Sequence, residues 1–255
     1  MKKNKTYNVL FIGNSYTYFN DMPAAIFKEI AESAGYSVRV SSIVKGGWTL
    51  EKHADPADEC GGKVEQALNG EKYDFVVLQE QSCNPATDTD SFYSACRLLA
   101  KKIKKNGAQI LLYSTWGRKK GSSVLEKYGF TTESMTYKLA AAYESIGEEL
   151  GIARAYVGLA FFDVTSNTDI DLYDRDLTHP SYSGSYLAAM TLFSRMFEED
   201  AESILFDGEL PRGEAEILKK AAKRASEGGY HIPDEYKSSS EGVGKKTIVL
   251  DNKSI

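Results

Sequence analysis

The sequence predicts a three-layer α/β sandwich, in which helices cover both faces of a central, mostly parallel five-stranded sheet. Short apolar runs alternate with helical stretches about five times along the chain. The run at 75–78, Phe-Val-Val-Leu, has no polar alternation, which is typical of a strand that is buried on both faces. With 255 residues, 42% of them hydrophobic, the chain is long enough to bury such a core without disulfides.

Each element has its own local signal. The expected strands span residues 7–12, 37–44, 75–78, 109–113 and 153–157, and the expected helices span residues 21–34, 64–68, 90–105, 132–150, 182–197 and 214–225. In the first helix, Asp21 is expected to cap the start, Pro23 suits the first turn and Gly35 ends it. We expect one domain over residues 1–226 and a polar C-terminal extension over 227–255, with a short strand at 247–250.

Composition excludes several classes of protein. The net charge of −5, from 36 acidic and 31 basic residues, argues against nucleic acid as a partner. Three cysteines without a CxxC pair and three histidines predict no disulfide framework, no metal site and no cofactor. The apolar run at 9–12 is too short for a signal-peptide core, and no stretch is long enough to span a membrane. The expected location is therefore cytoplasmic, unless a leader has been removed.

The first strand ends in Gly13-Asn14-Ser15-Tyr16-Thr17. In open parallel sheets, ligands bind at the carboxyl ends of the strands, so functional residues should come directly after a strand. A serine at a sharp strand-to-loop turn suggests a nucleophile held clear of the sheet. A simple turn, in which Asn14 or Ser15 caps the next segment of the chain, is the alternative. A phosphate loop is excluded, since the sequence has neither GxGxxG nor GxxxxGK[ST] at this place.

The most informative motif is Asp176-Leu177-Thr178-His179-Pro180-Ser181. An acid three residues before a histidine can orient the imidazole and stabilise it when it becomes positive. The spacing favours Asp176 over Asp174 for this role. The alternative is a helix-capping segment. With Ser15 as the partner, His179 and Asp176 form a candidate catalytic set.

Two further loops carry candidate oxyanion donors. Gly46-Gly47 follows the second strand, and a glycine lets its backbone N–H approach a ligand closely. Gln79-Glu80-Gln81-Ser82 follows the third strand, where a side-chain amide can donate another hydrogen bond. A plain turn and a polar loop are the respective alternatives.

Aromatic residues gather near the same predicted edge of the sheet. Trp48 and Trp116 each follow a strand, and Tyr16 follows Ser15, so these residues together with Asn14 are candidate substrate contacts. Tyrosines outnumber phenylalanines, 16 to 11, and tyrosine suits a surface that is half apolar and half wet. His53 is expected to be a solvated helix residue.

The order of these blocks resembles the SGNH, or GDSL-like, hydrolase superfamily. That family has a Ser block after the first strand, a Gly block after the second, a GxND block after the third and a DxxH block near the end. Residues 7–200 carry the resemblance, and the wording GNSYT with LQEQS is similar to an uncharacterised SGNH-like subgroup. Two positions differ, because Asn14 stands where the family has Asp and Gln81 where it has Asn.

The resemblance implies a flavodoxin-like SGNH hydrolase fold and a serine esterase. It makes Ser15 the nucleophile, His179 the general base and Asp176 the orienting acid, with an oxyanion hole formed by the Ser15 and Gly47 N–H groups and the Gln81 amide. The expected substrate is a small-molecule or glycan ester, such as an acylated carbohydrate, without a membrane or nucleic-acid partner. A non-catalytic carbohydrate-binding protein of the same fold is the alternative.

Overall fold

The computed structural model describes residue 1 and residues 3–237. Its five strands are β1 (Thr6–Gly13), β2 (Ser37–Val44), β3 (Phe75–Leu78), β4 (Gln109–Tyr113) and β5 (Ala153–Ala155). They form one sheet in the order β2-β1-β3-β4-β5, and every neighbouring pair is parallel. The predicted α/β fold class is therefore confirmed. Because all strands point the same way, the loops that follow them meet at one edge of the sheet.

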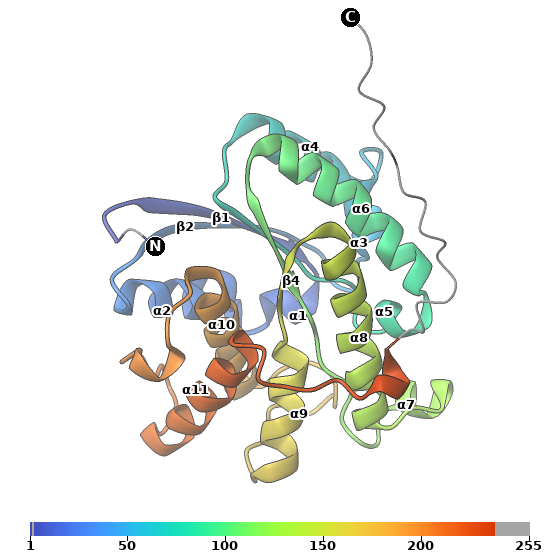
Figure 1. Cartoon of the computed structure of the whole chain (residues 1–255), viewed down its shortest axis with the longest axis vertical. Coiled ribbons are helices and arrows are strands. Elements are labelled where there is room, and N and C mark those ends of the chain that lie inside the picture. Colours follow the sequence, from blue (N-terminus) through green and yellow to red (C-terminus); the bar gives the residue numbers. More distant parts are fainter. Residues whose placement is uncertain (2, 238–255) are drawn as a thin grey trace, which may run out of the picture.

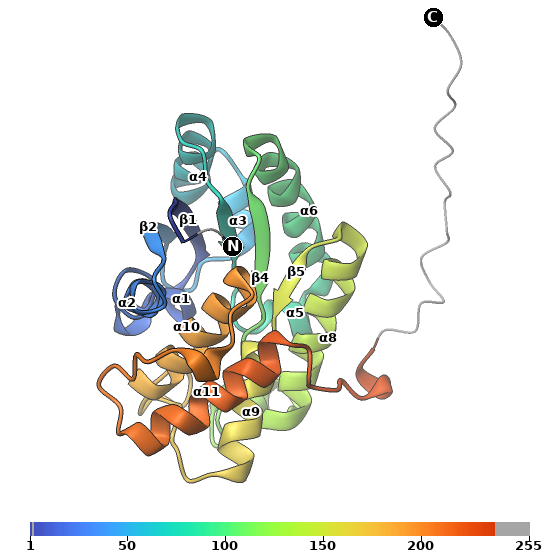
Figure 2. The same cartoon turned by 60° about the vertical axis from the view of Figure 1, so that its left-hand side comes forward.

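Helices cover both faces of this sheet (Figures 1 and 2). One face carries the π-helical turn η2 (Pro23–Phe27) with α2 (Lys28–Ser33), α9 (Val157–Asn167), α10 (Tyr182–Phe197) and α11 (Arg212–Ser226). The other face carries α3 (Leu50–Ala54), α4 (Glu59–Gly70), α6 (Thr89–Asn106) and α8 (Thr132–Leu150). Residues of β1 alternate between the two cores, with Val9 and Phe11 in the first and Leu10 and Ile12 in the second. This is the period of two that a strand imposes.

The helix expected at 21–34 is broken. It consists of the 3₁₀ turn η1 (Phe19–Asp21), then η2, then α2. Asn20 and Asp21 have φ values of 54° and 50°, in the left-handed region, so a continuous helix cannot run through them. The expectation that Asp21 caps the helix is therefore wrong, and Met22 precedes η2 without a side-chain cap.

Other element bounds differ for local reasons. The helix expected at 64–68 is the longer α4, because the Asp58 carboxylate caps it by accepting a hydrogen bond from the Cys60 N–H at 2.8 Å. The strand expected at 153–157 stops at Ala155, and the apolar residues from Val157 onward form α9, which the sequence did not predict. The remaining short elements are α1 (Ser15–Tyr18), α5 (Asn84–Thr87), α7 (Ser123–Tyr128), η3 (Ala201–Ser203) and η4 (Asp234–Tyr236).

Residues 227–237 begin the predicted C-terminal extension. Ile232 is buried against Leu159 of α9 and against α8, and the Tyr230 hydroxyl donates a hydrogen bond to Asp163 at 2.7 Å. The start of the extension thus lies on the domain surface, and the boundary at residue 226 stays a prediction. The strand expected at 247–250 lies outside the described residues. In the part of the chain that is described, no helix has both the length and the apolar character needed to cross a bilayer.

Candidate active site

Ser15 is the first residue of α1, directly after β1. The Asn14 side chain caps this short helix by accepting a hydrogen bond from the Tyr16 N–H at 3.1 Å. The Ser15 N–H lies in the first turn, so it has no acceptor within the helix. Gly13 is required here, because a Cβ at this position would lie 2.6 Å from both Gln79 Oε1 and Thr17 Oγ1. The turn therefore places the Ser15 hydroxyl and its own N–H on the carboxyl edge of the sheet.

Asp176 and His179 lie in the loop that leads into α10. One carboxylate oxygen of Asp176 accepts hydrogen bonds from the backbone N–H groups of Thr178, at 3.0 Å, and His179, at 2.9 Å. The other oxygen accepts a hydrogen bond from His179 Nδ1. Leu177 between them has a φ of 61°, which tightens the turn. Asp174 does not bond the ring; its carboxylate accepts from the Arg175 N–H.

The imidazole joins the two motifs. His179 Nε2 lies 2.7 Å from Ser15 Oγ, although 164 positions separate the two residues in the sequence. Since Nδ1 donates to Asp176, Nε2 is the nitrogen that accepts the Ser15 proton. Phe19 stacks on the imidazole with ring centroids 4.0 Å apart and planes within 1°. The ring is therefore held from the side as well as from both nitrogens.

Asp176 is ionised in this arrangement. Desolvation raises the pKa of its carboxyl group, but hydrogen bonds from the His179 ring and from the N–H groups of His179 and Thr178 outweigh it, so the pKa lies below its usual range. An ionised carboxylate at Nδ1 stabilises the imidazolium that forms when Nε2 takes a proton. The Asp176 side chain is 47% exposed and that of His179 is 22% exposed, so solvent screens this stabilisation in part.

The candidate oxyanion donors lie in two neighbouring loops. Gly47 has a φ of 70° and is exposed, and the next carbonyl along, that of Trp48, accepts a hydrogen bond from Asn14 Nδ2 at 3.0 Å. The oxygen of the Gln81 amide accepts hydrogen bonds from the N–H groups of Cys83, at 2.8 Å, and Asn84, at 3.3 Å. Within the described residues no acceptor occupies Gln81 Nε2, so this group remains able to donate. That it faces the Ser15 oxygen stays a prediction.

Three of the predicted substrate contacts are buried in the structure. Trp116 is 0% exposed; it stacks on Phe161 and Tyr16, and its Nε1 donates to the Thr178 carbonyl at 3.1 Å. Tyr16 and Asn14 are buried as well. All three residues pack against the Ser15 turn or the His179 loop and support it. Trp48 stays a candidate contact, because its ring is partly exposed, with the Lys45 and Lys52 ammonium groups over it at 3.7 and 3.9 Å.

His53 is also placed differently from the prediction. It is fully buried, and its Nε2 donates a hydrogen bond to the Gly13 carbonyl at 2.9 Å. Burial lowers its pKa, so the imidazole is neutral. His53 lies on the short helix α3, which packs over the end of β1. Its side chain therefore points into the fold and not into solvent. His53 therefore holds the end of the strand that leads into Ser15.

Sequence reasoning missed several residues around the site. Gln79 and Glu80 lie directly after the apolar strand β3, and both are buried. The guanidinium of Arg118 donates to Thr178 Oγ1 and, at 2.7 Å, to Ser82 Oγ, so it ties the loop after β3 to the His179 loop. The available signal was the position of Gln79 and Glu80, since a polar pair directly after a buried strand has to find partners inside the fold.

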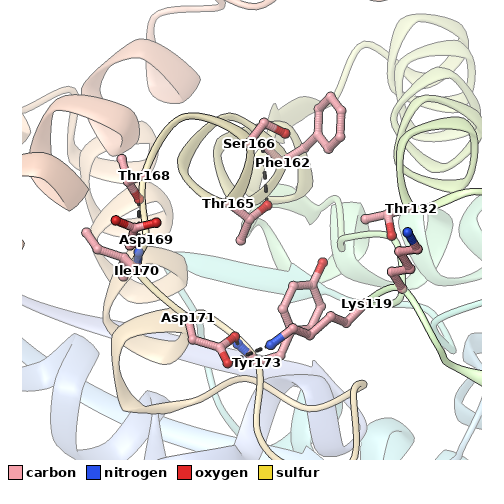
Figure 3. A pocket seen from close by; sticks show the side chains of 11 residues that line it. Lys119, Thr132, Phe162, Thr165, Ser166, Thr168, Asp169, Ile170, Asp171 and Tyr173 are labelled. Atoms are coloured by element: carbon pink, nitrogen blue, oxygen red, sulfur yellow. Dashed lines mark hydrogen bonds and ion pairs between the residues drawn. The ribbon is translucent and has the colours of Figure 1, made fainter.

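A cavity of about 410 Å³ lies beside the site (Figure 3). Lys119 and Asp171 form an ion pair at its rim, next to Tyr173. The cavity adjoins the His179 loop, since the Lys119 N–H donates to the Leu177 carbonyl at 3.0 Å. Neither Ser15 nor His179 lines it, so these two candidate catalytic residues lie outside the cavity. Among the described residues, no three His, Cys, Asp or Glu side chains are grouped so as to hold a metal ion.

The chain matches no protein-family model and no curated protein sequence. Solved structures do match. A protein from Slackia heliotrinireducens that has been assigned to the SGNH hydrolases is 33% identical; the match covers 74% of this chain and 98% of that one, with a TM-score of 0.66. A DUF4886 family protein from Bacteroides uniformis is 20% identical over 90% of this chain and 98% of its own, with a TM-score of 0.77.

A more distant likeness concerns the fold alone. A catalytic mutant of an acetylxylan esterase from Geobacillus stearothermophilus is 16% identical to this chain. That match covers 74% of this chain and 93% of the esterase, with a TM-score of 0.56.

Proposed function

This chain belongs to the SGNH (GDSL-like) hydrolase superfamily, and from that premise we propose that it is a carboxylic ester hydrolase with Ser15, His179 and Asp176 as its catalytic residues. The observation that carries the proposal is the hydrogen-bonded line from Ser15 Oγ through both ring nitrogens of His179 to Asp176. A serine, a base and an orienting acid in this order are the parts that acyl transfer needs.

The proposed reaction has two steps. His179 Nε2 takes the Ser15 proton while Oγ attacks the ester carbonyl, and the resulting oxyanion accepts hydrogen bonds from the Ser15 N–H, the Gly47 N–H and the Gln81 amide. His179 then gives the proton to the leaving alcohol, which leaves an acyl group on Ser15. A water molecule repeats the sequence: His179 takes its proton, the hydroxide oxygen attacks the acyl carbon, and the proton returns to Ser15 Oγ as the acid departs.

We propose an acylated carbohydrate as the substrate. Two observations support this choice. Trp48 presents a partly exposed indole in the loop that carries Gly47, and a sugar ring could pack on it in place of the Lys45 and Lys52 ammonium groups that lie over the ring. Tyr18, 39% exposed, lies beside the same loop, since a Cβ on Gly46 would come within 3.1 Å of its hydroxyl. The acetylxylan esterase shares the fold with this chain, which makes acetylated xylan the first substrate to try.

The test is the Ser15→Ala variant, measured with p-nitrophenyl acetate. Loss of the nucleophile is expected to lower kcat by at least about 10⁴-fold, while the melting temperature stays that of the wild type. A fluorophosphonate should label the wild type and not the variant. Ser123→Ala, at an exposed serine that begins α7, is the matched control and should retain full activity. Unchanged turnover by Ser15→Ala would reject the assignment. A wild type that binds glycans but resists the label would favour the non-catalytic alternative.

A further inference from the structure

The tripeptide Gln79-Glu80-Gln81 follows the central strand β3. We propose that Glu80 is a positioning residue: its buried carboxylate fixes the loop after β2 against the loop after β3, and so sets the spacing of the oxyanion donors Gly47 and Gln81. This inference rests on the proposed function for its catalytic consequence. We call the hydrogen bonds from the Leu50 and Gln81 N–H groups to Glu80 the clamp. The clamp can be measured without any substrate.

The contacts of Glu80 reach both loops. Its Oε1 and Oε2 lie 3.1 and 3.2 Å from the Leu50 N, at the start of α3, and Oε1 also accepts from the Gln81 N–H at 2.5 Å. The Glu80 N–H donates to the Tyr143 hydroxyl at 3.0 Å, which holds its backbone against α8. The side chain therefore crosses from one candidate oxyanion loop to the other.

The burial of Glu80 argues that this contact has a purpose. The residue is 1% exposed, and no lysine, arginine or histidine of the described chain is paired with it, since the charged groups that act on it are the carboxylates of Glu51 and Asp88. A carboxylate buried without a cation costs several kcal/mol of folding free energy, which its hydrogen bonds from the Leu50 and Gln81 N–H groups offset in part. Burial raises the pKa of Glu80 to about 7, while the hydrogen bonds from Gln81 and Leu50 act in the opposite direction.

Gly47 needs such an anchor because it has no side chain to pack. A Cβ at Gly47 would find no atom within 4 Å, so the space that a side chain would occupy at this position is open. The turn that contains Gly47 is closed by the Trp48 N–H, which donates to the Lys45 carbonyl at 3.1 Å, and the Lys45 N–H donates to the Gly13 carbonyl at 3.3 Å. Two further contacts hold the C-terminal side of this loop. Asn14 Nδ2 binds the Trp48 carbonyl, and Glu80 binds the Leu50 N–H two residues later. If the hydrogen bond from Leu50 to Glu80 were lost, only the one from Asn14 to the Trp48 carbonyl would remain of these two contacts.

The other two members of the tripeptide show that each side chain serves one loop. Gln79 Oε1 accepts from the Asn14 N–H at 2.9 Å and from Thr17 Oγ1 at 2.8 Å, so Gln79 fixes the nucleophile turn. Gln81 Oε1 fixes its own loop through the N–H groups of Cys83 and Asn84. Glu80 is the member that reaches the Gly47 loop. The end of β3 thus supports all the predicted donors and the nucleophile.

The experiment asks whether the length or the charge of the Glu80 side chain matters. Glu80→Gln keeps an oxygen that can accept from both N–H groups, Glu80→Asp keeps the charge but is one methylene too short, and Glu80→Ala removes both. Displacing a donor by about 1 Å can cost on the order of 10²-fold in rate. We expect Glu80→Asp and Glu80→Ala to lower kcat for p-nitrophenyl acetate by about 10- to 100-fold with little change in KM, and Glu80→Gln to stay within about 3-fold of the wild type.

The matched control is Asn106→Ala. Asn106 is a buried clamp at the opposite edge of the sheet, where its side chain bonds the carbonyls of Leu68 and Glu71 and the N–H of Tyr73. Its loss should lower the melting temperature without lowering kcat. Amide hydrogen exchange gives a readout without substrate: Glu80→Ala should speed exchange at Leu50 and Gln81, and Asn106→Ala should not.

The outcomes distinguish the inference from the proposed function. If the wild type turns over esters and Glu80→Asp matches it in kcat, or if Glu80→Gln is as slow as Glu80→Ala, the positioning role is wrong. If exchange at Leu50 is unchanged in Glu80→Ala, the clamp itself is wrong. If no ester is turned over but exchange rises as expected, the clamp stands and the proposed function fails. Should Glu80→Ala not fold, the comparison of Gln with Asp still decides.

Discussion

Asp176 uses its two carboxylate oxygens for different tasks. One oxygen holds the turn through the N–H groups of Thr178 and His179, and the other holds the imidazole through Nδ1. An amide in place of the carboxylate could keep the first task, because its oxygen still accepts both N–H groups. It could not keep the second, because an NH₂ group cannot accept the Nδ1 proton. The two tasks can therefore be separated by substitution.

We expect Asp176→Asn to lower kcat/KM by about 10²- to 10⁴-fold while leaving the melting temperature nearly unchanged, because the amide favours the wrong tautomer of His179. Asp176→Ala should lose as much activity and also some stability, since it releases both turn N–H groups. Steady-state kinetics and thermal unfolding of the two variants check this. Equal melting temperatures for Asp176→Ala and the wild type would show that the carboxylate does not hold the turn.

Residue spacing predicted the polar line of the site but not its aromatic surroundings. Ser15, His179 and Asp176 each follow a strand or precede a helix in a pattern that few other arrangements explain, and the structure brings them within hydrogen-bonding distance. Trp116 also follows a strand, but the sequence does not say whether its ring turns outward to solvent or inward onto α9. In the fold Phe161 and Tyr16 enclose it. Such choices depend on packing between distant elements, which a single sequence does not reveal.

At the scale of elements, the ends of the neighbouring parallel strands β1 and β3 approach each other closely at the site. Gly13 ends β1 beside Gln79, whose oxygen accepts from the N–H of the next residue, Asn14. A side chain at Gly13 would occupy the place of that oxygen. The Ser15 turn can approach the end of β3 this closely because the strand ends in a residue without a Cβ.

Gly13→Ala is expected to push Gln79 away, leave the Asn14 N–H and Thr17 hydroxyl without an acceptor, and lower the melting temperature by several degrees with a loss of at least about 10-fold in kcat. Gly70→Ala is the control, since a Cβ at the end of α4 would meet no atom within 4 Å. It should be neutral or slightly stabilising. If the two alanine variants have the same kcat and melting temperature, the close packing at Gly13 affects neither activity nor stability.

The strands were more predictable than the helices for a physical reason. Strands β2, β3 and β4 have the bounds that their apolar runs predicted, because glycine or polar residues follow each run. In contrast, α9 begins two residues after β5, and its first residues are as apolar as a buried strand. Periodicity cannot distinguish a short buried strand from a buried helix. The sequence therefore predicts a strand that runs to residue 157, two residues beyond the end of β5.

At the scale of the whole molecule, the sheet separates two apolar cores, and Glu80 is buried on the side of α3, α6 and α8. The titratable groups that act on it there are Glu51, Asp88, Cys96 and Tyr143. Of these, Glu51 and Asp88 disfavour its charge, as burial itself does. We retain the proposal that residues 1–226 form the hydrolase domain, with residues 227–237 lying on α8 and α9.

Glu80 should make the stability of the domain fall toward alkaline pH. Its pKa is about 7 in the folded chain against an ordinary value of 4.5, so the folded state binds the proton more tightly. Its contribution is therefore fully present below about pH 4.5 and is lost as the pH rises through 7, by at most about 3 kcal/mol. Glu80→Gln removes this titration, and urea unfolding at a series of pH values between 5 and 8 should show a flatter profile for the variant. Parallel profiles for the two proteins would mean that Glu80 is ionised at little cost in the folded state. The upward shift of its pKa would then be wrong, whereas the contacts to Leu50 and Gln81 that give Glu80 its positioning role would be untouched by this result.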